Sequence, residues 1–279
     1  MAATSVHANA VKAQAMQPQH GQGVHDGIQY HFFAEDKFFS VRVIETKSLK
    51  HHSAWLFDGK AREVVNSTEP LQRLGGDRYN VKASRFHIAT TDTGGSMGVL
   101  GDGGRTEFEL KFTCPVSFNW TFPGGPAIHQ AHIRAEISYG GRTLNAIGYS
   151  KRYWYHQDIG YWAWRFIQAN VENGRYMLWT ADANFDLDKY DYFKIVQPDG
   201  TMTASENRDS LHRDDYARGV VKGTTYELEL RELGRWETVL RTNLMDTKLR
   251  QRFCKIAVKS NGKVETGYAL NELGYGTAW

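Results

Sequence analysis

Five pairs of an aspartate or asparagine followed by glycine divide the chain beyond residue 28 into short segments. Each pair lies between runs rich in β-branched and aromatic residues, and such pairs suit the positive φ angles of tight hairpin turns. Hairpins join antiparallel neighbours, whereas a parallel α/β fold needs regular helical crossovers, which this sequence lacks. The sequence therefore predicts a meander of antiparallel strands. The pairs are Asp58-Gly59, Asp102-Gly103, Asn173-Gly174, Asp199-Gly200 and Asn261-Gly262.

Strands of this length and spacing are typical of β-sandwiches and β-barrels. Helix is expected only in two short pieces, near residues 70–74 and 246–253. The chain of 279 residues is long enough for one large β domain or two smaller ones. Its aromatic fraction of 13%, with eight tryptophans, favours β structure or aromatic-lined cavities. We predict an all-β protein with little helix.

The charge distribution argues against nucleic acid as a partner. The 34 basic and 31 acidic residues nearly balance, and no stretch gathers lysine and arginine into a block. The two cysteines, Cys114 and Cys254, cannot build a disulfide framework, which favours a reducing compartment. The sequence shows neither a secretory signal pattern nor an apolar run long enough for a membrane span. We expect a soluble, cytoplasmic protein.

The expected domain organisation is an arm followed by two β lobes. Residues 1–27 are small and polar without an apolar pattern, which predicts a disordered arm. The pair Gly148-Tyr149 returns as Gly267-Tyr268, and this offset of 119 residues, from position 148 to position 267, is about the size of one small β domain. We therefore expect lobes at 28–145 and 146–279, with the functional site near their junction.

The densest group of functional side chains lies at residues 148–166, GYSKRYWYHQDIGYWAWRF. Nearly every side chain there is large, and most can donate or accept hydrogen bonds. Apolar walls with a few polar tips are what a site for a small, largely apolar molecule requires. This stretch is the predicted functional site.

If residues 150–158 are extended, Arg152, Trp154, His156 and Asp158 share one face, and Lys151, Tyr153, Tyr155 and Gln157 share the other. Asp158 can then orient the imidazole of His156 and raise its basicity, as a general base requires. The alternative is a buried histidine that a neighbouring carboxylate satisfies for structural reasons.

Trp162, Trp164 and Phe166 share a face of the next segment. Such a face is usually core, but tryptophan also lines sites for aromatic or isoprenoid ligands. Glu272, in the segment GYALNE, is a candidate general acid if it is buried among apolar side chains. The alternative is an exposed glutamate near the chain end.

Metal and nucleotide sites are not predicted. Neither His51-His52 nor the pair His129 and His132 has ligand spacing on a strand, and no HExxH or CxxC motif occurs. The glycine-rich stretches at 94–98 and 101–104 are interpreted as turns, because no helix pattern follows to bind phosphate.

The motif Gly-x-x-x-Arg followed by His-x-x-x-Gly-x-x-x-Trp in residues 148–164, with the segment GYALNE about a hundred residues later, resembles a known group. These are the tandem lipocalin-like, calycin-type proteins of the hydroxyneurosporene synthase and AttH-like group. The resemblance implies two lipocalin-like β-barrels, a hydrophobic ligand and, in the enzyme members, cofactor-free acid–base chemistry. The positions that match the motif are Arg152, His156, Trp164 and Glu272.

The chain also departs from that group. Tyr153-Trp154-Tyr155 stands where relatives often have aspartate before the histidine, and Gln157-Asp158 replaces the serine and tryptophan that often follow it. The substrate and the reaction can therefore differ from those of the group.

The leading hypothesis is a cofactor-independent lyase or hydratase for a hydrophobic aromatic or isoprenoid molecule, acting by hydration, dehydration or a related elimination or cyclisation. His156, oriented by Asp158, would move a proton, and Arg152 would steady developing negative charge. The complementary acid would be Tyr153, Tyr155 or Glu272. The predicted pocket walls are Trp154, Tyr161, Trp162, Trp164 and Phe166.

Two other functions remain open. A lipocalin-type carrier would bind the same kind of ligand without altering it. A β-sandwich glycosidase would pair Asp158 with Glu272, or Glu172 with Asp182. No cofactor and no metal are expected, and the sequence leaves a homodimer open.

Overall fold

The computed structural model describes residues 9–12, 25–46, 49–75, 78–122, 125–155, 161–185, 188–205, 211–241 and 245–278. Nearly all of these residues lie in strands, and the single helical piece among them is a short 3-10 segment, Asp102–Gly104. No helix in the described part of the chain is long and apolar enough to cross a membrane. The prediction of an all-β protein is confirmed.

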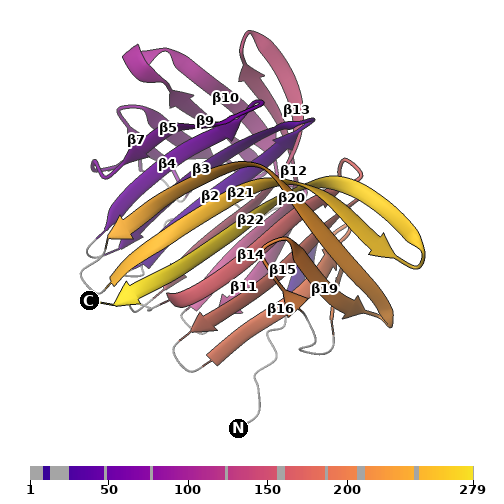
Figure 1. Ribbon diagram of the computed structural model, residues 1–279. Helices are drawn as coiled ribbons and strands as arrows, with labels where there is room; N and C mark the ends of the chain where they lie inside the picture. Colours follow the sequence, from indigo (N-terminus) through magenta and orange to yellow (C-terminus); the bar gives the residue numbers. More distant parts are fainter. Residues whose placement is uncertain are drawn as a thin grey trace. The chain divides into compact units, whose positions relative to one another are not determined.

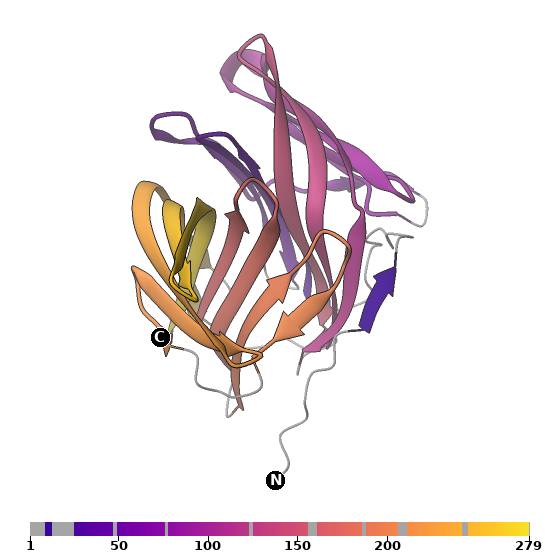
Figure 2. The same cartoon turned by 90° about the vertical axis from the view of Figure 1, so that its right-hand side faces the viewer.

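The described strands form two antiparallel sheets (Figure 1). The first sheet has the order β5-β4-β3-β2-β13-β12-β10-β9-β8-β7-β6, and β11 joins β1 to β12. The long hairpin of β12 and β13 can be followed in Figure 2. The strands are β1 (Asn9–Lys12), β2 (His25–Ala34), β3 (Lys37–Thr46), β4 (Lys50–Phe57), β5 (Ala61–Ser67), β6 (Gln72–Arg73), β7 (Val81–Ala83), β8 (Phe86–Thr90), β9 (Gly94–Leu100), β10 (Thr106–Thr113), β11 (Val116–Phe122), β12 (Gly125–Tyr139) and β13 (Arg142–Tyr155).

The second sheet has the order β17-β16-β15-β14-β22-β21-β20-β19-β18. Its strands β20, β21 and β22 are long and curved and run side by side (Figure 1). The strands are β14 (Tyr161–Val171), β15 (Tyr176–Phe185), β16 (Asp188–Val196), β17 (Met202–Ala204), β18 (Leu211–His212), β19 (Tyr216–Val221), β20 (Thr224–Arg241), β21 (Met245–Ser260) and β22 (Lys263–Ala278).

The two sheets share one connectivity. In each, four consecutive strands lie side by side, and the first of them also pairs with the last strand of its sheet, β13 or β22. Those two last strands carry the repeated Gly-Tyr pair. Neither glycine has room for a side chain. A Cβ atom at Gly148 would lie 2.5 Å from the ring of Phe32, and one at Gly267 would lie 2.1 Å from the carbonyl oxygen of Asn170. The architecture is that of two lipocalin-like β lobes in tandem.

The turns predicted at the five Asp-Gly and Asn-Gly pairs are confirmed, but the glycine-rich stretch 94–98, also interpreted as a turn, lies in β9 and pairs with β8 and β10. All five glycines of the Asp-Gly and Asn-Gly pairs have positive φ angles, for example 76° at Gly59 and 74° at Gly262. Four of the pairs join consecutive strands, and Asp102-Gly103 lies in the 3-10 segment between β9 and β10. Glycine adopts these angles without steric cost, so the local sequence determines where the strands turn back.

The two expected helical pieces are wrong. Residues 246–253 lie within β21, and residues 72–73 form β6. In the first half of β21 burial recurs at every second position, at Thr247, Leu249 and Gln251, with more exposed residues between them. That period of two belongs to a strand, and pairing with β20 and β22 along its length stabilises the extended conformation.

The chain divides into two compact units. The first unit comprises Met1–Phe32, Ser40–Ala54 and Val64–Ile159, and the second comprises Phe33–Phe39, Trp55–Glu63 and Gly160–Trp279. The expected lobe boundary at residues 145 and 146 falls inside β13, which pairs with β12 on both sides of that point. β1 and the start of β2 lie within the segment 1–27, for which the sequence predicts an arm.

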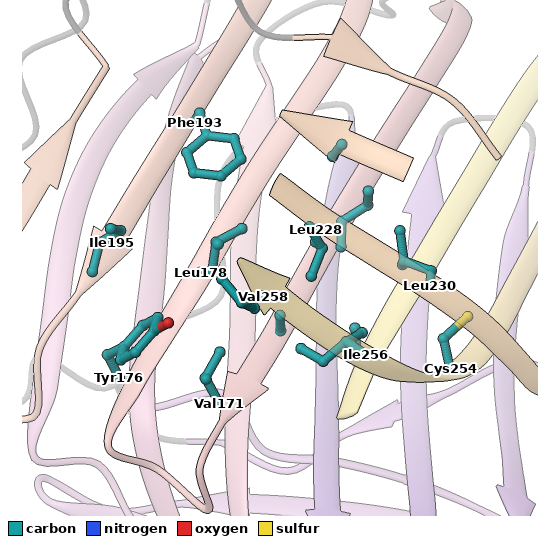
Figure 3. Close-up of a cluster of buried hydrophobic side chains, with 14 of the residues drawn as sticks. Val171, Tyr176, Leu178, Phe193, Ile195, Leu228, Leu230, Cys254, Ile256 and Val258 are labelled. Carbon is teal, nitrogen blue, oxygen red and sulfur yellow. The ribbon is translucent and has the colours of Figure 1, made fainter. Parts of the chain in front are cut away.

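One face of the second sheet carries the apolar core of the second unit (Figure 3). On β14 this core takes Ile167, Ala169 and Val171, and on β21 it takes Cys254, Ile256 and Val258. Because side chains alternate along a strand, Trp164, Phe166 and Gln251 point to the opposite face. That opposite face holds the site described next.

Candidate functional site

A buried carboxyl group lies in the second unit, on the sheet face away from the apolar core. Glu272 on β22 is 2% exposed and stands directly between Phe166 on β14 and Gln251 on β21. Its Oε1 accepts a hydrogen bond from the indole Nε1 of Trp164 at 3.0 Å, and its Oε2 accepts one from Nε2 of Gln251 at 2.6 Å. Both oxygens are therefore held in place.

A second tryptophan fixes the orientation of this hydrogen-bond chain. The indole Nε1 of Trp55 donates to Oε1 of Gln251 at 2.6 Å. An indole N–H can only donate, so the amide oxygen of Gln251 must face Trp55 and its amide NH2 must face Glu272. The four side chains, called the Glu272 network below, thus deliver two N–H donors to one carboxyl group, which complements a negative charge.

Glycine makes room for the network on the neighbouring strand. Gly274 stands opposite Trp164 in the register of β14 and β22. A Cβ atom at Gly274 would lie 2.2 Å from Cζ2 of Trp164. The indole therefore lies over the bare backbone of β22 and reaches Glu272, two residues along the same face.

Aromatic rings pack against the Trp55 end of the network within the second unit. The ring of Trp55 lies 4.9 Å from that of Phe38 and stacks on Trp236 at 6.5 Å. Phe253 lies 5.2 Å from Phe38 and 5.3 Å from Tyr268. An acidic group among aromatic walls is the combination expected of a site for a small apolar molecule.

Three predicted residues meet in this unit: Trp164, Phe166 and Glu272. His156 and Asp158 lie outside the described residues, as do the side chains of Tyr155, Tyr161 and Trp162. The predicted His156–Asp158 base therefore stays a prediction.

The alternation predicted for Arg152, Tyr153 and Trp154 is present in β13 of the first unit. Arg152 is fully buried and forms an ion pair with Asp26. Its guanidinium also donates to the carbonyl oxygens of Gly27 at 3.0 Å and Tyr153 at 2.5 Å, and it lies over the rings of Tyr79 and Trp154. Arg152 thus has a matched charge and fixed contacts, a structural role that the sequence did not reveal.

Tyr153 projects from the opposite face of β13. Its ring occupies the space beside Gly27, where a Cβ atom would lie 2.2 Å from Cζ of the tyrosine. The ring of His25 contacts it edge-on at 5.3 Å, and Nζ of Lys151 lies 5.2 Å from its centroid. Burial, followed by the charges of Arg42 and Lys151, lowers the pKa of His25 to about 4, so this histidine is neutral at pH 7.

Sequence reasoning missed Trp55, Gln251 and Gly274. Trp55 and Gln251 are 196 residues apart, so no local pattern links them. A buried glutamine in an alternating strand is a weak signal, and Gly274 gains its meaning only from the register with Trp164. Among the described residues, no group of three or more histidine, cysteine, aspartate or glutamate side chains is placed to hold a metal ion.

The sequence matches no protein-family model and no curated protein. The fold, in contrast, is similar to that of several solved structures. An AttH-like protein from Nitrosomonas europaea superposes with a TM-score of 0.60 at 13% identity, covering 92% of this chain and 94% of that one. Kievitone hydratase from Nectria haematococca gives 0.60 at 10% identity, with 93% and 90% covered. CghA in complex with Sch210972 gives 0.53 at 11% identity, with 96% and 95% covered.

These similarities extend over nearly the whole of each chain. The protein therefore has the fold of the tandem lipocalin-like proteins, and the resemblance noted in residues 148–164 and 267–272 is confirmed at the level of the fold. At 10–13% identity the comparison does not extend to the reaction or the substrate.

Proposed function

We propose that the protein is a cofactor-independent lyase or hydratase that acts on a hydrophobic small molecule, with Glu272 as its acid–base group. One observation carries the proposal: a carboxyl group that is 2% exposed, gripped at both oxygens by Trp164 and Gln251, lies in an aromatic environment. Kievitone hydratase, a hydratase by name, has the same fold, which supports this class of reaction.

The chemistry needs one group that gives a proton and takes one back. In a dehydration, the carboxylate that the two N–H donors favour removes a proton from the carbon next to the alcohol carbon, the double bond forms, and the departing hydroxyl takes the proton from the carboxyl and leaves as water. A hydration is the reverse. Trp164 and Gln251 would hold the carboxyl oxygens in one orientation through both steps, so that little reorganisation is needed during the reaction.

The aromatic rings near the Glu272 network indicate the class of substrate. Trp55, Phe38, Trp236 and Phe253 offer ring faces and no charge. Such walls favour an aromatic or isoprenoid molecule, in which an alkene or a tertiary alcohol would be the reacting group.

The test is a turnover assay in water labelled with heavy oxygen, on a panel of hydrophobic alkenes and alcohols that includes kievitone. We expect the substrate to gain or lose one molecule of water, and mass spectrometry detects this change in its mass. Glu272→Gln should lower the rate by about a hundredfold to ten-thousandfold, the usual contribution of a general acid or base. The melting temperature shows whether the variant is folded.

A matched control is available in the same unit. Glu63 also accepts a hydrogen bond from an indole, that of Trp236 at 2.5 Å, and Glu63→Gln should keep its turnover. Full turnover by Glu272→Gln would remove the proposal. A compound that binds tightly and is recovered unchanged would favour the carrier, and His156→Ala tests the predicted histidine base in the same assay.

A further inference from the structure

A second group of ionisable side chains lies in the first unit, on one face of three adjacent strands. It is called the histidine–tyrosine face below. Tyr149, Lys151 and Tyr153 occupy alternate positions of β13 and so point the same way. His129 of β12 stands opposite Lys151 in the register. Two histidines of β2 contact these tyrosines. The ring centroid of His31 lies 6.1 Å from that of Tyr149, and the ring centroid of His25 lies 5.3 Å from that of Tyr153.

The histidine–tyrosine face is buried although it is polar. His31 is 0% exposed, His129 and Tyr149 are each 1%, and Lys151 and Tyr153 are each 6%. Buried sheet faces are ordinarily apolar, because taking polar groups out of water costs free energy. On the other face of the same sheet the rings of Tyr30, Phe32 and Phe112 pack together, and the buried charge of Arg152 is paired with Asp26. The histidine–tyrosine face contains no carboxylate among its members, so an ion pair of that kind does not account for its polar character.

Within this face a tyrosine and a histidine form a direct pair. Oη of Tyr149 lies 2.8 Å from Nδ1 of His129, and the ring of His31 stacks on Tyr149 at an angle of 22°. A phenol hydroxyl bonded to an imidazole can donate a hydrogen bond or a proton to an oxygen placed beside it, because the imidazole can supply or accept a proton in turn.

The charge on this face is positive. Lys151 belongs to it, and the charges of Lys151 and Arg42 both lower the pKa of His25, in addition to the larger effect of burial. None of its six members is a carboxylate. Such surroundings favour an oxygen that carries negative charge, and the ring faces favour an aromatic body attached to that oxygen.

We propose that the histidine–tyrosine face binds an aromatic ligand through an acidic oxygen, a phenol or an enol, with Tyr149 and His129 as the pair that hydrogen-bonds to that oxygen. This binding site goes beyond the acid–base role proposed for Glu272 and does not depend on it. Its ligand is bound in the ionised form, which the nearby cations stabilise.

The probe is para-nitrophenol, whose absorbance distinguishes the phenol from the phenolate. The full-length protein should bind it and increase the phenolate fraction at a given pH. Tyr149→Phe and His129→Gln should each weaken binding about tenfold, the usual effect of losing one hydrogen bond to a charged group. Circular dichroism establishes that each variant is folded.

Tyr30→Phe is the matched control. Tyr30 is a fully buried tyrosine of the same unit on the opposite sheet face, and its hydroxyl has no hydrogen-bond partner among the described residues. Its replacement should leave probe binding unchanged. An effect as large as that of Tyr149→Phe would assign the probe to another site and overturn the proposal.

A measurement on the unaltered chain covers the case in which a variant does not fold. The imidazole nitrogens of His129 should shift in the NMR spectrum on addition of para-nitrophenol, while those of His51, which contacts Asn66 at 2.8 Å, should not. No absorbance change in the unaltered protein at millimolar probe, or no shift of the His129 signals, would overturn the proposal.

Discussion

Trp164 and Glu272 are 108 residues apart in the sequence and are joined by an N–H···O hydrogen bond of 3.0 Å. The bond runs diagonally between β14 and β22, because the register places Phe166 opposite Glu272 and Gly274 opposite Trp164. These are the first and last strands of the second sheet. The proposed acid–base group is therefore positioned by the same strand pairing that sets the connectivity of the sheet.

Replacing Gln251 by methionine should destabilise the second unit. The change keeps the volume but removes the amide that bonds to the indole N–H of Trp55 and to one oxygen of Glu272. Each buried polar group that loses its bond costs about 1–3 kcal/mol, so the loss of both bonds should lower the free energy of unfolding by about 2–6 kcal/mol. Urea denaturation measures this. A variant as stable as the original chain would show that water or another group replaces the amide.

Gly274→Ala should displace the indole of Trp164 from Glu272. The new methyl group would lie 2.2 Å from Cζ2 of Trp164, far inside contact distance. Overpacking of this kind costs about 1–3 kcal/mol. The variant should also change tryptophan fluorescence and, if Glu272 is the acid–base group, lower turnover. Gly75→Ala is the control, because nothing lies within 4 Å of the added carbon, and it should change neither property.

The buried ion pair of Arg152 and Asp26 should show strong coupling. Asp26→Asn leaves the fully buried guanidinium without its carboxylate, and the loss of one member of such a pair costs about 3–5 kcal/mol. The double variant Asp26→Asn with Arg152→Met removes both charges and should be more stable than Asp26→Asn alone. Thermal unfolding of the unaltered chain, the two single variants and the double variant gives the coupling energy between Asp26 and Arg152. Additive losses would mean that the pair contributes only packing.

The turns of this fold could be predicted from the sequence because their determinants are local. Gly59 and Gly262 adopt positive φ angles next to an aspartate and an asparagine, as the dipeptides require. The failure at residues 246–253 has the opposite origin. Their extended conformation comes from β20 and β22, whose pairing residues lie elsewhere in the chain, and a short segment does not show its partners.

Some residues of the candidate site could also be predicted from the sequence, whereas their contacts could not. Trp164 and Glu272 were conspicuous as an aromatic face and as a glutamate between glycines and tyrosines, so the sequence could propose each of them separately. Their contact, and the contribution of Trp55, arise from tertiary structure, because Trp55 lies 196 residues from Gln251. For Arg152 the sequence indicated an unusual arginine, but the carboxylate that pairs with it, Asp26, lies in a segment without any motif.

Replacing Lys194 by methionine should raise the free energy of unfolding at neutral pH. Its side chain is buried, with Nζ 4.5 Å from the centroid of the Tyr192 ring, and burial lowers its pKa from 10.5 to about 6. Because the folded pKa lies below the unfolded one, the unfolded chain binds more protons between about pH 6 and pH 10.5, so stability rises with pH across this window.

Lys194→Met removes that dependence. The gain in unfolding free energy should be about 3–6 kcal/mol near pH 7, should reach a constant maximum at and below about pH 6, and should vanish as the pH approaches 10.5. Urea denaturation over this pH range measures the gain. Lys255→Met, at an exposed position of β21, should change stability by no more than about 0.5 kcal/mol at any pH. A gain for Lys194→Met that stays constant with pH would come from packing, and it would mean that the lysine is protonated in the folded protein.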